Sequence, residues 1–154
     1  MPRLRSTTRR DLGHLLKASP GIGRALALLT EAAMAGPSSL SFAERAALGH
    51  AVALEAEDRA PETSDLLLPL VRLARKLADD PRKLSDADFE AVYDAGWDDA
   101  AVVHAIVIVG ITGLLDRLVV ALDLTKMPRE DLVATLLRLA KEGYGAAELM
   151  ASRD

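Results

Sequence analysis

Apolar residues recur along the chain three or four positions apart, and no stretch shows the alternation typical of a half-buried strand. The clearest stripe consists of Leu66, Leu70, Leu73 and Leu77. Turn-forming residues separate the stripes. The pattern therefore predicts an all-α protein with six to seven helices. We expect these helices at about residues 22–35, 40–58, 66–77, 85–96, 98–117 and 127–143, with a last short turn at 144–150.

Several helix ends carry capping signals. Ser41 is followed three positions later by Glu44, a capping box in which the serine accepts a backbone N–H and the glutamate reaches back. Ser85 starts a shorter helix by the same logic, and Gly96 is expected to end it in the left-handed conformation. Pro69 lies early in the leucine stripe, so that helix either begins near it or is kinked there.

The most apolar helix follows Asp98 or Asp99, either of which is expected to cap it. Residues 100–115 carry no charge, so this helix is apolar on every side and must be surrounded by protein. The uncharged run is shorter than the roughly 18 residues of a membrane span, which favours a core helix over a membrane segment. Six or seven helices cannot easily enclose it. We therefore expect other subunits to supply the missing cover, in a homo-oligomer (dimer, trimer or hexamer).

Several polar or small positions mark this helix. Gly110 and Gly113 each cost roughly 1 kcal/mol relative to alanine, which close approach of another backbone would offset. His104 reads either as a buried, neutral imidazole bonded to a carbonyl or as a ligand-binding group. Asp116-Arg117 reads as a polar pair where the helix leaves the core. His104 and Asp116 lie roughly 18 Å apart along the helix, too far for a catalytic dyad.

Composition narrows the class of protein further. The length of 154 residues suits one domain, half the residues are apolar and only 3% are aromatic. The formal charge of −4 and a basic cluster at about residues 1–12 indicate a flexible tail or an oligomer arm rather than a nucleic-acid site. There is no cysteine, which excludes disulfides and thiolate catalysis. No leader pattern is seen, so we expect a cytoplasmic protein without membrane, nucleic-acid or cofactor partners.

One block carries a resemblance. Phe89 to His104, followed by the apolar run to Asp116-Arg117 and then Ala121-Leu122-Asp123-Leu124, is similar to the second half of the alkylhydroperoxidase D-like and carboxymuconolactone decarboxylase-like proteins. In their peroxidase-related branch, a short helix ends in glycine and an aromatic residue, before an acidic cap and an apolar helix. The similarity covers about residues 38–124 and implies the helical bundle of that superfamily.

The preceding half departs from the family pattern. There the family's signature helix carries a glutamate and then a Cys-x-x-Cys pair. In this chain the two thiols would fall near Asp58 and Pro61, and the glutamate at Ala46, close to Glu44. Because a thiol peroxidase needs one thiolate to attack and a second thiol to resolve, that activity is not expected here.

Candidate catalytic residues remain near that position. The stretch from Glu55 to Glu62 crowds four carboxylates around the expected end of the helix. If that helix continues to Asp58, His50 and Glu57 share a stripe about 10 Å apart. His50 with Glu57 or Asp58 then forms an acid–base pair only through a bridging ligand. The same groups suit a divalent metal, but their spacing matches no metal motif, and no metal is expected.

Three hypotheses of function follow. The first is a cysteine-free, non-redox relative of the superfamily that acts by ligand binding or assembly, with Glu44, His104, Asp116 and Arg117 as candidate ligand-binding residues. The second is a decarboxylase-type enzyme that uses His50, Glu57 and Asp58 on a small carboxylated substrate. The third is a helical interaction module whose pattern merely converges on that of the family.

Overall fold

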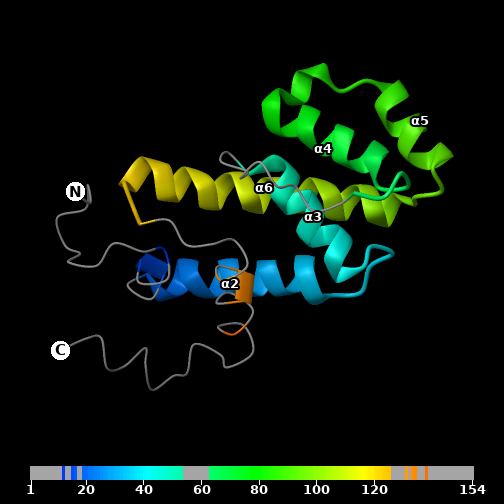
Figure 1. Ribbon diagram of the computed structural model, residues 1–154. Helices are drawn as coiled ribbons and strands as arrows, with labels where there is room; N and C mark the ends of the chain where they lie inside the picture. The colour runs from blue at the N-terminus through cyan, green and yellow to red at the C-terminus, as the bar shows by residue number, and fades with distance from the viewer. Residues whose placement is uncertain are drawn as a thin grey trace, which may run out of the picture. The chain divides into compact units, whose positions relative to one another are not determined.

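The computed structural model describes residues 12, 15, 16, 19–53, 63–125, 131, 133, 134 and 138. Within that part of the chain the protein is helical, which confirms the predicted fold class. Its α-helices are α2 (Pro20–Ala35), α3 (Phe42–Val52), α4 (Leu68–Asp79), α5 (Asp86–Asp94) and α6 (Asp99–Leu122), and a 3-10 turn, η1 (Pro81–Lys83), joins α4 to α5 (Figure 1).

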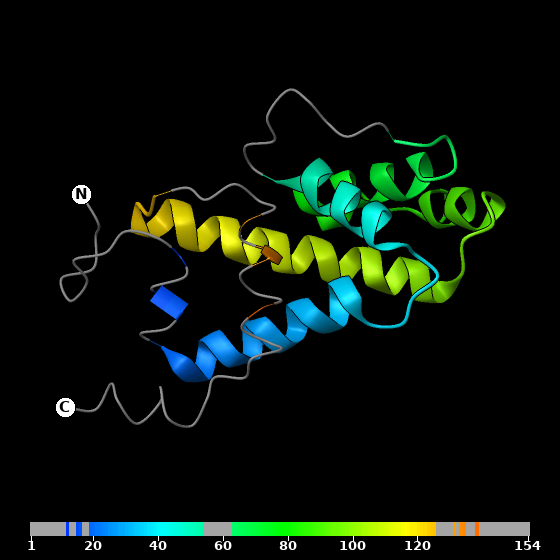
Figure 2. The same cartoon turned by 60° about the horizontal axis from the view of Figure 1, so that its bottom comes forward.

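The chain forms two compact units. One comprises Met1–Ala32 and Arg117–Asp154, and the other comprises Ala33–Asp116. The second unit holds α3, α4 and α5 together with most of α6, and in two views these helices lie along the first part of α6 (Figures 1 and 2). The second unit also contains most of the candidate site residues within the described ranges.

Local signals explain where several helices begin and end. Ser41 Oγ accepts from the Glu44 N–H at 3.3 Å, and Glu44 Oε2 accepts from the Ser41 N–H at 2.7 Å, which confirms the capping box of α3. Before α5, the Asp88 carboxylate accepts from the Ser85 N–H at 2.9 Å. Gly96 has a φ of 92°, the left-handed conformation that its position after α5 predicts.

The leucine stripe differs in part from the prediction. The helix α4 begins at Leu68 with Pro69 in its first turn, so the proline starts the helix and does not kink it. Leu70 and Leu73 are buried, but Leu66 precedes the helix and is 51% exposed. The prediction that Leu66 belongs to the buried stripe was therefore wrong, because Leu66 lies in the turn before the helix and not on its buried face.

The helix α3 is shorter than predicted. It ends at Val52, and Ala53 adopts an extended backbone with ψ of 139°. The prediction that this helix continues to Asp58 is therefore wrong. The four carboxylates of residues 55–62, which were expected around the end of this helix, lie outside the described residues.

The helix α6 is longer than its uncharged run. It has 24 residues, continues past Asp116 and Arg117, and is followed by Asp123 with a φ of 53°. By length and composition alone α6 is long and apolar enough to cross a membrane, as are many core helices of globular proteins. The length argument against a span therefore does not hold, and the absence of a membrane partner stays a prediction. Asp116-Arg117 lies within the helix rather than at its end.

The core of the second unit is built from the inward stripes of α3, α4, α5 and α6. Its fully or nearly fully buried apolar side chains include Leu40, Leu48, Leu67, Leu70, Leu73, Ala74, Val92, Ala101, Ala105 and Ile108. Two polar bonds also tie loops to it. Trp97 Nε1 donates to the Leu66 carbonyl at 2.8 Å, and Ser39 Oγ donates to Asp98 Oδ1 at 2.8 Å.

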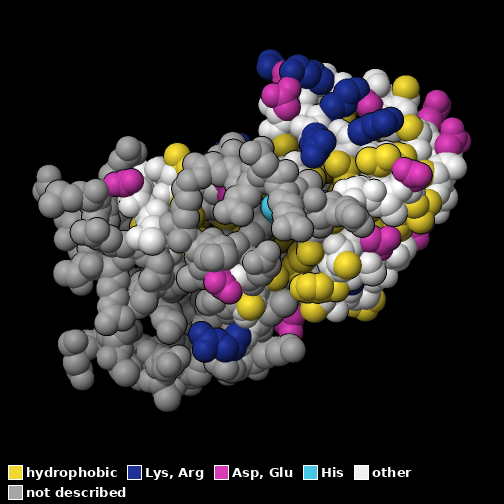
Figure 3. Space-filling view, viewed as in Figure 1, with side chains coloured by type: hydrophobic (Ala, Val, Ile, Leu, Met, Phe, Trp, Pro, Cys, Tyr) yellow, Lys and Arg dark blue, Asp and Glu magenta, His cyan; other side chains and the backbone are white. Residues whose placement is uncertain are grey.

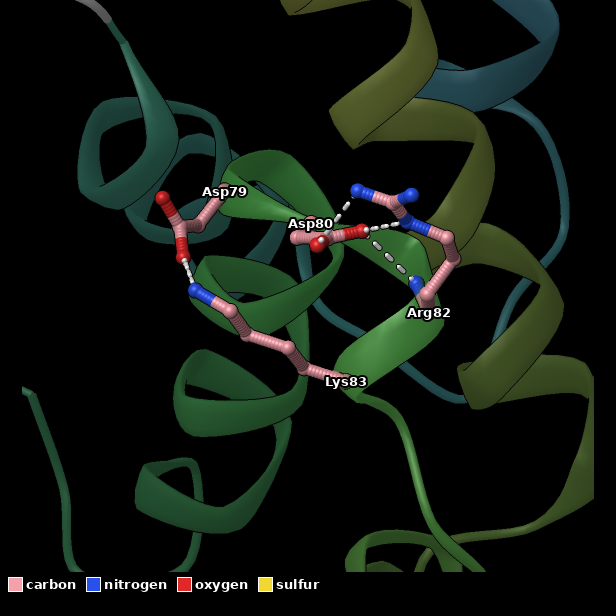
Figure 4. Close-up of polar contacts among 4 residues, drawn as sticks. All are labelled: Asp79, Asp80, Arg82 and Lys83. Atoms are coloured by element: carbon pink, nitrogen blue, oxygen red, sulfur yellow. Dashed lines mark hydrogen bonds and ion pairs between the residues drawn. The ribbon is translucent and has the colours of Figure 1, made fainter.

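Ion pairs define the connection between α4 and α5. Asp80 caps η1 and pairs with Arg82 at 2.9 Å, while Lys83 pairs with Asp79 at 2.5 Å (Figure 4). The side-chain hydrogen bond from Arg82 lowers the pKa of Asp80, and its backbone N–H adds to the effect. These contacts are exposed, so their part is to fix the turn rather than to stabilise the fold strongly.

Candidate functional site

His50 lies in the last turn of α3 and has an unusual environment. The imidazole is largely covered, and no group of the described chain forms a hydrogen bond with its buried Nε2 atom. A buried polar atom without a partner costs about 1–3 kcal/mol, so such atoms often mark a place where a ligand or water binds. His50 is therefore the predicted site residue with the clearest sign of an unmet bonding requirement.

Glu44 has a structural role. Its carboxylate is held by the Ser41 N–H at the first turn of α3, as the capping box requires. Glu44 and His50 are six residues apart, which places them about 120° apart around the helix. The structure thus assigns Glu44 to capping and does not bring it to His50.

His104 lies on α6 and is partly buried. Its Nδ1 is 2.9 Å from the Ala100 carbonyl, so Nδ1 carries the proton and donates to that oxygen. The predicted bond from His104 to a carbonyl is confirmed, but the ring is only partly buried, whereas a buried ring was expected. No hydrogen bond joins His104 to His50 or Glu44 in the part of the chain described.

The remaining predicted site residues have separate positions. Asp116 is partly buried and forms an interaction within the chain, and Arg117 is exposed on the next position of α6. Glu57 and Asp58 lie outside the described residues. The predicted acid–base set of His50, Glu57 and Asp58 therefore stays a prediction.

Two sets of polar contacts lie at the start of α6: they confirm the expected cap at Asp98 and add Ser39 and Tyr93, which the sequence did not single out. Asp98 caps α6 by accepting from the Ala101 N–H at 2.8 Å, and Ser39 donates to the same carboxylate oxygen. The backbone bond from Ala101 and then the Ser39 hydroxyl lower the pKa of Asp98. Tyr93 donates its hydroxyl to Asp99 at 2.8 Å, which raises the pKa of Tyr93. The Tyr93–Asp99 bond thus joins α5 to α6, and the Ser39–Asp98 bond ties the segment before α3 to the start of α6.

The helix α6 presents an apolar face to solvent, which we call the open face: Val103, Ile106, Gly110 and Leu114. Val103 is 57% exposed, Leu114 is 42% exposed and Ile106 is 38% exposed. A Cβ atom added at Gly110 would meet nothing within 4 Å. The spacing of these residues places them within about 80° of one another around the helix. The described part of the chain therefore leaves one face of α6 uncovered, in line with the expectation that a single copy does not easily enclose this helix.

A further pair of charged groups links α4 to α5. Lys76 Nζ lies 2.7 Å from Asp88 Oδ1. Bonds from Lys76 and then from Ser85 lower the pKa of Asp88 to about 2. The carboxylate of Asp88 is thus ionised throughout the neutral range and fixes the sides of α4 and α5 that face each other.

Comparisons with known proteins bear on the fold. No family model matches the sequence, and no curated protein matches it. Among solved structures, an uncharacterised peroxidase-related protein from Silicibacter sp. TM1040 is similar with a TM-score of 0.64 and 16% sequence identity, over 75% of this chain and 76% of that one. At this identity the similarity concerns the arrangement of helices and not the chemistry. The chain therefore shares the all-α fold of a peroxidase-related protein, without the cysteines that thiol chemistry needs.

Proposed function

We propose that this protein is a non-redox relative of the peroxidase-related proteins, and that its subunits assemble through the open face of α6. The observation that carries the proposal is the exposure of Val103, Ile106 and Leu114 on a single face of the most apolar helix. Contiguous apolar surface of this kind is typical of protein–protein contacts. The fold and the absence of cysteine support the first half of the proposal.

Gly110 adds a second argument for assembly. Glycine within a helix costs roughly 1 kcal/mol relative to alanine, and in the described chain a Cβ atom at Gly110 would have room. In the proposed assembly another backbone approaches Gly110 closely, as small residues permit at tight helix contacts. Contact with another subunit then explains both the exposure of the apolar residues around Gly110 and the presence of a glycine within the helix.

The variant Gly110→Ala tests this explanation. In an isolated chain the added methyl group meets open space and should raise the free energy of unfolding by about 1 kcal/mol, since alanine favours the helix. In the proposed assembly the same methyl group separates two backbones and weakens self-association. We therefore expect a more stable monomer that associates less tightly, measured by chemical denaturation and sedimentation equilibrium. Unchanged or tighter association would argue against close packing at Gly110.

Ligand binding at His50 is a second candidate function, favoured by the buried and unpartnered Nε2 atom. Leucine has nearly the volume of histidine and carries no polar atom. We therefore expect His50→Leu to raise the free energy of unfolding by about 1 kcal/mol, because the variant removes the buried polar atom. Residues kept for binding often lower stability in this way. His104→Leu is the matched control and should give no such gain, because it removes the Nδ1 bond to Ala100. A destabilised His50→Leu protein would show that Nε2 has a partner within the folded chain.

The decarboxylase-type alternative has weaker support. It needs a carboxylate beside an imidazole, and in the described ranges neither His50 nor His104 forms a hydrogen bond with one. The interaction-module alternative loses its main motivation, because the chain has the fold of a peroxidase-related protein over three quarters of its length.

A further inference from the structure

Positive side chains gather on one surface of the second unit, over α4 and η1 (Figure 3). Five cations lie between Arg72 and Lys83. Three of them have a carboxylate partner: Lys76 pairs with Asp88, Arg82 with Asp80 and Lys83 with Asp79. The other two, Arg72 and Arg75, form what we call the basic face of α4.

The basic face is exposed, and no carboxylate among the described residues neutralises it. Both guanidinium groups lie on the outer side of α4, one turn apart, and no ion pair with a carboxylate is formed by either within the described chain. Arg75 donates its Nε to the Ala51 carbonyl at 3.4 Å, and its two terminal nitrogens form no hydrogen bond with the described residues. Two like charges on adjacent turns repel each other, so a carboxylate between them would be favourable.

The neighbouring helix carries the complementary charge. Asp86, Glu90 and Asp94 recur every four residues along α5, all three are exposed, and α5 contains no basic residue. We call these three the acidic face of α5. Tyr93 lies at its edge and is 43% exposed. Arginine and tyrosine are both enriched in protein interfaces.

The two faces cannot neutralise each other within one chain. The Lys76–Asp88 pair marks the sides on which α4 and α5 face each other. The acidic face lies about 160° around α5 from Asp88, so it points away from α4. The basic face lies about 70° around α4 from Lys76 and also points outward. A contact between them therefore requires a second molecule.

We propose that the basic face of α4 in one copy binds the acidic face of α5 in the next copy. This inference rests on the proposed function, because it requires that copies of the chain associate. It adds a second contact that is distinct from the open face of α6. Since the two surfaces differ and point in different directions, the contact is head-to-tail and closes into a ring if the rotation permits. Arginine forks bind carboxylates in a bidentate manner, which sets the register of the contact.

A second copy fits the basic face better than a nucleic acid does. The chain is acidic overall, with a formal charge of −4, and the acidic face lies one helix away from the basic face. A long polyanion would meet that negative charge as well as the two arginines. The acidic face of a sister copy presents a short row of carboxylates four residues apart, against two arginines that are three residues apart.

Charge reversal tests the contact. Reversal of the basic face (Arg72→Glu with Arg75→Glu) and reversal of the acidic face (Asp86→Lys with Glu90→Lys) should each weaken self-association at least about tenfold at low salt, since unscreened charges of like sign then meet. One chain carrying all four substitutions should regain the affinity of the wild type. The control, Arg24→Glu with Arg138→Glu, changes the net charge by as much as reversal of the basic face does, at exposed positions elsewhere. It should leave the affinity unchanged.

Sedimentation equilibrium measures all five proteins, and circular dichroism verifies that each is folded. The contact is overturned if the fourfold variant does not regain association, or if the control pair weakens it equally. The contact is also overturned if reversal of the basic face abolishes binding of an added acidic peptide or RNA but leaves self-association unchanged. A wild type that associates but is insensitive to both reversals refutes this contact and leaves the open face intact. A wild type that stays monomeric refutes both.

Discussion

Replacing Val103 and Leu114 by glutamate is expected to convert the assembled protein into folded monomers. Both side chains lie on the open face of α6, more than two fifths exposed. Burial of an apolar side chain of this size is worth roughly 1.5–3 kcal/mol, and each glutamate also places a charge in the contact. Because about 1.4 kcal/mol is a factor of ten in affinity, self-association should weaken at least about a hundredfold.

A matched control separates the surface from its added charge. Ala46 on α3 and Ala91 on α5 are exposed positions outside the open face, so Ala46→Glu with Ala91→Glu adds the same two charges. This control should associate like the wild type. Sedimentation velocity gives the size of each particle, and the helical content of both variants should be unchanged, since glutamate is a good helix former. A Val103→Glu, Leu114→Glu protein that sediments like the wild type would contradict assembly through α6.

Replacing Arg45 by methionine is expected to give the largest loss of stability. Arg45 is only 6% exposed, although it carries a charge. Its Nη1 donates to the Ala33 carbonyl at 3.0 Å and to the Gly36 carbonyl at 2.9 Å, at the end of α2. Helices leave their last carbonyls without partners, and α2 has no basic residue in its own last turn. Arg45 of α3 supplies the missing donor and the favourable charge.

The expected cost of Arg45→Met is about 2–4 kcal/mol in the free energy of unfolding, because bonds to charged donors are strong and two carbonyls lose their partner. The buried Nε, unpartnered in the described chain, offsets part of that cost. Arg24→Met, at an exposed position on α2, is the control and should change stability by less than about 0.5 kcal/mol. Urea denaturation measures both. A loss below about 1 kcal/mol for Arg45→Met would show that Arg45 does not hold the end of α2.

Local signals in the sequence were reliable guides to the fold. The capping box of Ser41 and Glu44 and the left-handed Gly96 depend on residues three to five positions apart, and the structure has both. Where a signal was missing, the prediction was wrong. Residues 53–58 contain no glycine or proline, so nothing in the pattern ended α3 at Val52. Asp116-Arg117 looked like an end, but no helix breaker follows before Asp123.

Long-range features were not predictable from one sequence. Ser39 and Asp98 are 59 positions apart, so their bond depends on the packing of the whole second unit. Arg45 looked like an ordinary charged residue of a helix, because burial depends on which elements cover it. The basic face of α4 and the acidic face of α5 were present as helical spacings, and a search for charge periodicity would have found them.

The central claim is that sister copies cover the open face of α6. Sedimentation equilibrium of the wild-type chain, in detergent-free buffer over a range of protein concentrations, tests it most directly. The account predicts a mass that is a multiple of 16.4 kDa and that falls to the monomer as the protein is diluted. A particle of 16.4 kDa at every concentration would contradict it, as would a chain that stays in solution only with detergent or lipid.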